Sequence, residues 1–296
     1  MNGPAPRSAS LGEVLAVWTL WAAVLAMILA TYWRVDVADL YHVSENGLGG
    51  GLSRALVETN FPISLVAIPI ALVALDVLPR RAWWVGGPAI LLCAVTAWPG
   101  VVDQDDLDAK LANALPATGV AIVLVLTVAA AQVAGVRLAP RRGLDALRVI
   151  VAVVVLVLSI PWIAAELGFF LPDGVFLMQK LGREADGTVI PAVHLGHHHG
   201  LDGSVLVLSG LLLSRVAPRG RRLGLVFSLY VALMLAYGAM QLAEDGWHEQ
   251  FVKRGWLEWT IPASLEPKLA PIWLVTLGIA AVIAFVLVRE RSSPVS

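Results

Sequence analysis

The chain has 296 residues, of which 58% are hydrophobic and 15% charged, and its mean hydropathy is +0.78. Soluble domains carry about 25% charged residues, so this composition excludes a soluble globular protein. The net charge of −1 argues against a general nucleic-acid-binding protein, and the single cysteine, Cys93, excludes an intrachain disulfide or a zinc site built from several cysteines.

Eight apolar runs divide the chain, and each is long enough, or nearly so, to cross a bilayer as a helix. They predict an all-α, polytopic membrane helix bundle that forms a single integral membrane domain over residues 1–296. The first run is too long for the core of a secretion signal, so we expect it to remain as a span. The runs are Leu11–Thr31, Phe61–Leu78, Ala82–Val101, Pro116–Val136, Ala146–Leu167, Leu201–Val216, Leu223–Leu242 and Pro271–Val288.

The segment before the second run is expected to form a loop. Glycines are frequent between residues 43 and 51, which favours a flexible turn, and Asn60 can cap the helix that begins at Phe61. The charged residues Arg54 and Glu58 then belong to this loop rather than to a span.

Charged residues are distributed unequally between the two sets of alternating loops. One set is short, and its acids are Glu13, Asp76, Asp145 and Glu290, whereas its arginines are Arg7, Arg80, Arg81, Arg137, Arg141, Arg142, Arg148, Arg215, Arg219, Arg221, Arg222, Arg289 and Arg291. Cytoplasmic loops carry an excess of Lys and Arg, so this side, with both termini, is predicted to be cytoplasmic. The opposite, extracytoplasmic side holds the longer loops, the other acids and all the histidines, and we expect function there.

The strongest candidate for chemistry is a histidine cluster before the sixth span. On a helix, His194, His198 and Asp202 would recur every four residues and share one face. Neutral imidazoles suit zinc, copper or iron, and a nearby carboxylate can orient a ligating imidazole. The candidate metal-binding residues of this segment are His194, His197, His198, His199 and Asp202.

A second candidate lies where the seventh span leaves the membrane. Asp245 and His248 have the i, i+3 spacing of a carboxylate–histidine ligand pair, and Glu244 is an i, i+4 alternative. Because a short turn joins the sixth and seventh spans, their extracytoplasmic ends should lie close together. We therefore expect Asp245 and His248 to complete the metal site, with Glu244 as a catalytic acid or base.

Glu166 closes the fifth span and is a further catalytic candidate. A carboxylate at the edge of an apolar helix is costly and points to a role as ligand, general base or hydrogen-bond partner.

One local resemblance accompanies these residues. His194-Leu-Gly-His197-His198 is similar to one histidine box of the membrane fatty-acid desaturases and hydroxylases. Those enzymes carry several boxes on the cytoplasmic face, whereas this chain has one, on the side predicted to be extracytoplasmic. The resemblance therefore supports metal binding and does not assign the chain to that family.

The sequence thus favours a metal-dependent enzyme of the cell membrane, with zinc or iron in an extracytoplasmic site and copper as a further option. The expected substrate is a lipid or a membrane-proximal small molecule, and hydrolysis requires fewer partners than oxidation. Two alternatives remain: a transporter of metal or solute, and a structural or assembly protein. The near absence of ionisable residues in the middle of the spans argues against a transporter.

Overall fold

The computed structural model describes residues 11–34, 47–98, 100–101, 107–167, 181–183, 189–191, 199–262 and 270–292. Apart from one short antiparallel hairpin, β1 (Leu181–Arg183) with β2 (Val189–Pro191), the regular structure in these ranges is helical. The α-helices are α1 (Leu11–Arg34), α2 (Gly47–Val77), α3 (Trp83–Ala94), α4 (Ala114–Ala134), α5 (Asp145–Glu166), α6 (His199–Leu213), α7 (Arg221–Trp247) and α8 (Ile272–Ser292).

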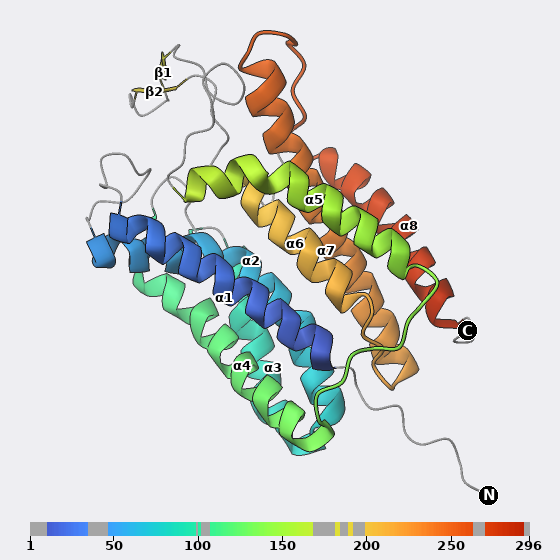
Figure 1. Ribbon diagram of the computed structural model, residues 1–296. Helices are drawn as coiled ribbons and strands as arrows, with labels where there is room; N and C mark the ends of the chain where they lie inside the picture. Colours follow the sequence, from blue (N-terminus) through green and yellow to red (C-terminus); the bar gives the residue numbers. More distant parts are fainter. Residues whose placement is uncertain are drawn as a thin grey trace, which may run out of the picture.

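Shorter helical turns extend several of these helices. Two 3₁₀ turns flank α3, namely η2 (Arg80–Ala82) and η3 (Val95–Ala97), and η4 (Leu111–Asn113) precedes α4. A π-helical turn, η5 (His248–Val252), continues α7. The end of α7 projects beyond its neighbours α5, α6 and α8 (Figure 1).

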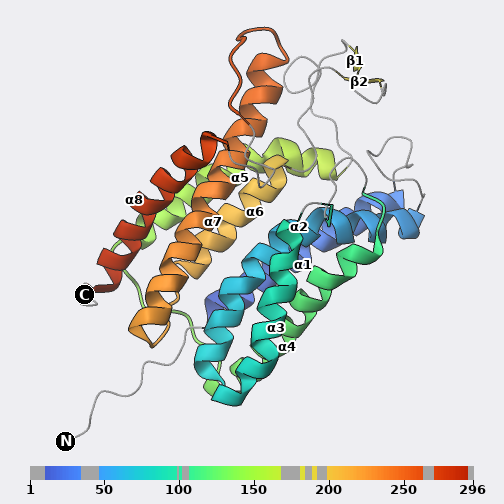
Figure 2. The ribbon, with the colours of Figure 1, turned by 180° about the vertical axis from the view of Figure 1, so that it is seen from behind.

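The helices form two groups of four that pack against each other. Helices α1–α4 lie together in one group and α5–α8 in the other, as the front and back views both show (Figures 1 and 2). Helices α1 and α2 contact α6, and α2 also contacts α7. The start of α1 and the end of α8 lie at the same end of the bundle (Figure 1), as an even number of antiparallel passes requires.

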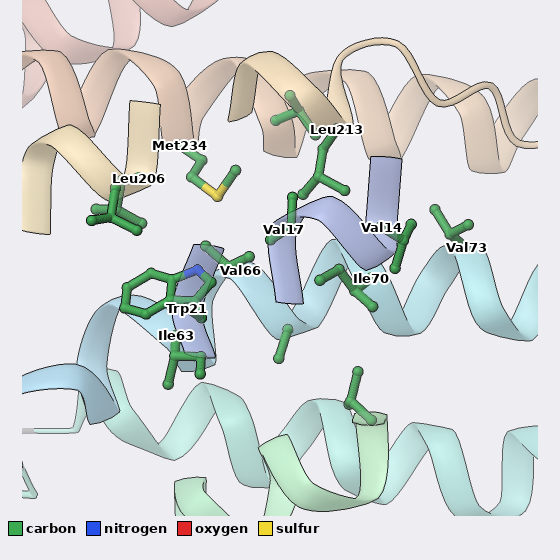
Figure 3. Close-up of a cluster of buried hydrophobic side chains, with 14 of the residues drawn as sticks. Val14, Val17, Trp21, Ile63, Val66, Ile70, Val73, Leu206, Leu213 and Met234 are labelled. Atoms are coloured by element: carbon green, nitrogen blue, oxygen red, sulfur yellow. The ribbon is translucent and has the colours of Figure 1, made fainter. Parts of the chain in front are cut away.

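The core lies where the two groups meet. Apolar side chains from α1, α2, α6 and α7 converge there, among them Trp21, Ile70, Leu206 and Met234 (Figure 3). Some polar groups in this contact are paired across it, which offsets the cost of burying a polar group in an apolar interior. The indole nitrogen of Trp21, for example, donates to Ser209 Oγ of α6 at 3.2 Å.

The prediction of an all-α membrane bundle is confirmed. Within the described ranges, six helical segments are long and apolar enough to cross a membrane. The third predicted span, Ala82–Val101, is shorter than expected, since α3 has 12 residues. The sixth predicted span, Leu201–Val216, was expected to be short, and α6 has 15 residues. The outward surfaces of α4, α5 and α8 carry exposed leucine, valine and isoleucine side chains, as helices that face lipid do.

The start of the second span was predicted wrongly. Helix α2 begins at Gly47 rather than Phe61, so the glycine-rich segment is helical from residue 47 and Asn60 lies inside the helix. Instead of capping, the Asn60 amide donates to the Asn113 carbonyl at 2.9 Å. Arg54 and Glu58, expected in a loop, form a buried ion pair along α2, with Nε and Oε2 at 2.7 Å. The i, i+4 spacing of these opposite charges is the signal that would have indicated a helix.

Two prolines lie inside α2, and the structure provides a partner for a carbonyl that one of them releases. Proline has no N–H, so Pro69 cannot donate to the carbonyl of Leu65 one turn earlier. The hydroxyl of Tyr230 on α7 donates to that carbonyl instead, at 2.9 Å. This hydrogen bond connects the two groups of helices across their contact.

Candidate functional site

The ends of α5, α6 and α7 that lie opposite the chain termini meet around one tryptophan. The indole of Trp162, on α5, is buried, and its nitrogen donates to Asp245 Oδ2 of α7 at 2.6 Å. The ring fits against two glycines, Gly200 on α6 and Gly246 on α7. A Cβ added at Gly200 would overlap the ring, and one at Gly246 would lie 3.6 Å from Cη2. Trp162 therefore fixes the positions of three helix ends at once.

Asp245 holds the beginning of α6. The same oxygen, Oδ2, accepts a hydrogen bond from the backbone N–H of Gly200 at 3.1 Å, and Asp245 as a residue is 5% exposed. Gly200 is the second residue of α6, so this N–H is one of those that a helix start leaves without an internal partner. A carboxylate at this position also interacts favourably with the helix dipole.

A close contact of backbones keeps α6 and α7 together below this point. A Cβ built at Gly203 would lie 2.6 Å from the carbonyl oxygen of Gly238, and one at Gly238 would lie 2.8 Å from that of Gly203. Small residues of this kind allow membrane helices to approach closely. The predicted proximity of the two helix ends is thus observed in the described residues.

Several further acidic side chains surround this junction, and we refer to it as the acidic end, defined by Asp202, Glu244, Asp245 and Glu249. Asp202, in the first turn of α6, is buried and lies close to Tyr237 of α7. Glu244 is partly exposed, and Glu249 forms an ion pair with Lys253 at 2.9 Å.

The structure describes only part of the predicted metal site. His194, His197 and His198 lie outside the described residues. His199 is the first residue of α6 and Glu166 the last of α5, although neither side chain is among those described; Glu166 lies one helical turn beyond Trp162. His248 begins η5, one turn after Glu244. Among the described residues no three His, Cys, Asp or Glu side chains form a metal-binding group, so the ligand set stays a prediction.

The opposite end of the bundle contains an ionic network that the sequence analysis did not anticipate. Glu13 of α1 is buried, and its Oε1 accepts from Arg215 Nε at 3.1 Å and from the Ala139 N–H at 2.8 Å. Arg215 also pairs with Asp145 of α5. These contacts connect the start of α1, the segment before α5, the start of α5 and the segment after α6.

Arg148 extends this network to α8. Its guanidinium forms an ion pair with Asp145 at 3.0 Å and donates to Glu290 Oε1 at 2.9 Å. We call these residues the arginine-rich end, defined by Glu13, Asp145, Arg148, Arg215 and Glu290. Burial lowers the pKa of Arg215, but hydrogen bonds to Glu13 and Asp145 outweigh it and raise the pKa above its ordinary value. Arg215 therefore stays charged, and its ion pairs connect α1, α5 and the end of α6.

Comparison with models of known protein families, with curated proteins and with solved structures finds no match. The assignment of function therefore depends on the site alone. At the arginine-rich end, the five residues that define it are paired with one another. At the acidic end, a buried carboxylate lies at the start of α6, directly after the histidine-rich segment.

Proposed function

We propose that this protein is a metal-dependent enzyme of the cell membrane, most simply a hydrolase, whose site lies at the acidic end. The observation that carries the proposal is the hydrogen bonding of Asp245. Its carboxylate is held by Trp162 Nε1 and by Gly200 N–H, and carboxylates that ligate metals are commonly fixed by such hydrogen bonds. Because His199 directly precedes Gly200, the histidine-rich segment ends one residue before the N–H group that donates to Asp245.

The donor set fits zinc or iron, with copper as a further option. Imidazole and carboxylate groups are the usual ligands of these metals in proteins. The proposed ligands are His194, His197, His198, Asp245 and His248, with His199 and Asp202 as further ligands or as hydrogen-bond partners of the ligands. A bound zinc ion would supply Lewis acidity to a hydrolytic reaction.

Two carboxylates are proposed for proton transfer. Glu244 is partly exposed and precedes Asp245 on α7, so it can exchange protons with water beside the site. Glu166 ends α5 one turn beyond Trp162 and is the second candidate acid or base. A water molecule that attacks a substrate would give its proton to one of these groups, and the leaving group would take a proton from the same pair.

The orientation and the substrate class belong to the same proposal. The arginine excess at the end where the chain begins and finishes supports a cytoplasmic location for that end, which gives the acidic end an extracytoplasmic location. A site at the membrane surface is accessible to lipids and to small molecules close to the bilayer. The partners are therefore the bilayer itself and a lipid or membrane-proximal substrate, and no nucleic acid.

The test compares metal content and lipid hydrolysis in purified variants. Wild-type protein is expected to retain about one or two equivalents of zinc, iron or copper, as bound metal sites do after purification. His198→Ala combined with His248→Ala should lose the metal, whereas His42→Ala, a histidine outside the proposed site, should keep it. Asp245→Asn keeps an oxygen for Trp162 and Gly200 but lacks the charge, so it should fold and bind metal weakly.

Glu244→Gln separates catalysis from binding. It should retain the metal and lose most of the release of fatty acid or headgroup from bilayer lipids, measured by mass spectrometry. A metal-free wild-type protein of normal stability would refute the proposal, as would an equal metal content in the double histidine variant. Full metal binding together with unchanged hydrolysis in Glu244→Gln would remove Glu244 from the proposed mechanism.

A further inference from the structure

An apolar pocket lies in the membrane-spanning part of the bundle, between the two groups of helices. Its volume is about 200 Å³, and it is lined by Phe61 and Leu65 of α2, Ala97 of η3, Tyr230 and Tyr237 of α7, and Trp273 of α8, together with neighbouring residues. Sites that enclose a whole small molecule have volumes of about 300–1,000 Å³. This pocket therefore suits part of a hydrocarbon chain rather than a complete ligand.

Aromatic rings form a fixed wall of this pocket. Tyr237 stacks on Trp273 with ring centroids 5.6 Å apart and contacts Phe61 edge to face at 6.2 Å. The hydroxyl of Tyr230 is used in the hydrogen bond to the Leu65 carbonyl, so that the tyrosine presents its ring. The pocket surface is thus almost free of groups that would require a polar partner.

The position of the pocket determines what can enter it. Its lining residues on α2, α7 and α8 belong to the helices that are apolar enough to span a membrane, and the pocket is partly open, with Ala97 exposed at its edge. Trp273 is at the start of α8, and Ala97 is at the end of the third helical segment, so the pocket is nearer the acidic end than the arginine-rich end. Helices of this length and composition can be surrounded by the hydrocarbon of lipids at this level.

The pocket is also aligned with Glu244. Residues seven apart on an α-helix lie on nearly the same face, about 10 Å apart along the axis. Tyr230, Tyr237 and Glu244 are spaced in this way on α7. A lipid acyl chain could end between Tyr230 and Tyr237 and run along this face of α7 towards the acidic end. The polar end of that lipid would then lie beside Glu244.

We propose that this pocket binds the end of a lipid acyl chain and so positions the lipid's polar end beside Glu244, which makes an acyl lipid the substrate class. The second part rests on the proposed function, whereas the binding of the chain does not. The occupant is a lipid rather than a protein helix because an apolar pocket of about 200 Å³ has room for one hydrocarbon chain and not for a helix, and the helices that line it are apolar enough to lie among lipids.

The experiment uses the full-length protein in nanodiscs that contain phosphatidylglycerol with a photoreactive diazirine on one acyl chain. With the diazirine at the chain terminus, crosslinks mapped by peptide mass spectrometry should concentrate on Phe61, Leu65 and the segment 230–237. With the diazirine next to the chain carbonyl, they should move along α7 towards Glu244. Uniform labelling of the lipid-facing helices, or no change between the two probes, would overturn the proposal.

A blocking variant and a matched control test the pocket itself. Ala97→Phe fills the pocket and should reduce the crosslinks of the terminal probe there by about tenfold, because the chain loses its apolar contacts. Ala281→Phe makes the same change on the exposed surface of α8 and should leave them unchanged. Equal labelling in Ala97→Phe would overturn the proposal.

Metal content measured on the same samples separates the two claims. If the wild-type protein binds its full content of metal but shows no labelling in the pocket, the binding of the acyl chain is contradicted and the proposed metal site is not. Strong pocket labelling in a protein without metal would support chain binding and refute the proposed enzyme.

Discussion

Replacing Gly200 by alanine should destabilise the junction of α5, α6 and α7. The added Cβ would overlap atoms Cε2 and Nε1 of Trp162 and lie 2.5 Å from Cδ2, so the indole must move. Its hydrogen bond to the Asp245 carboxylate, 2.6 Å long, would then break. Hydrogen bonds to charged groups contribute about 1.5–3 kcal/mol, and overpacking costs about 1–3 kcal/mol. The free energy of unfolding should fall by about 3–5 kcal/mol in total.

The assay is equilibrium unfolding in mixed detergent micelles, followed by circular dichroism. Gly278→Ala is the matched control, because a Cβ at Gly278 of α8 meets no atom within 4 Å, and it should raise stability by at most about 1 kcal/mol. Trp162→Phe in the Gly200→Ala background should cost less than the sum of the two single changes, since the clash is then smaller. Wild-type stability in Gly200→Ala would refute the packing of Trp162 described above.

Two further predictions concern contacts between distant parts of the chain. Glu13→Gln should lower the free energy of unfolding by about 2 kcal/mol, because it removes the charge that pairs with Arg215. The control, Glu258→Gln at an exposed position, should change the free energy of unfolding by less than about 0.5 kcal/mol. Equal stability of both variants would contradict the ion pairing described for the arginine-rich end. Tyr230→Phe should cost about 1 kcal/mol by leaving the Leu65 carbonyl without its donor. In a Pro69→Ala background, where residue 69 has its own N–H, the same change should be nearly neutral, and an undiminished cost there would contradict this role of Tyr230.

The apolar spans could be predicted from the sequence because they depend on local composition. Long runs such as Leu11–Thr31 have few ways to exist outside a membrane, and α1 begins at Leu11 as predicted. The start of α2 could not be predicted in the same way. Its first turns contain glycines and charges that are unfavourable alone, and the buried Arg54–Glu58 pair together with packing in the bundle compensates for them.

The candidate site could be predicted in part. The proximity of α6 and α7 followed from their short connection, and the contact between Gly200 and Asp245 agrees with it. The role of Trp162 was missed, because its partners are distant in sequence and an interfacial tryptophan looks like a membrane anchor. The network around Glu13 and Arg215 was missed for the same reason, as these residues are 202 positions apart.

We propose that the acidic end binds a metal through histidine and carboxylate ligands, and an X-ray absorption spectrum of the purified protein would detect that metal and its ligands. We expect the absorption edge of zinc, iron or copper, with the multiple-scattering pattern of imidazole and, for zinc, N/O ligands at about 2.0–2.1 Å. The His198→Ala and His248→Ala double variant should lose this spectrum. Absence of a metal edge in the wild type, or an unchanged spectrum in the double variant, would contradict the claim.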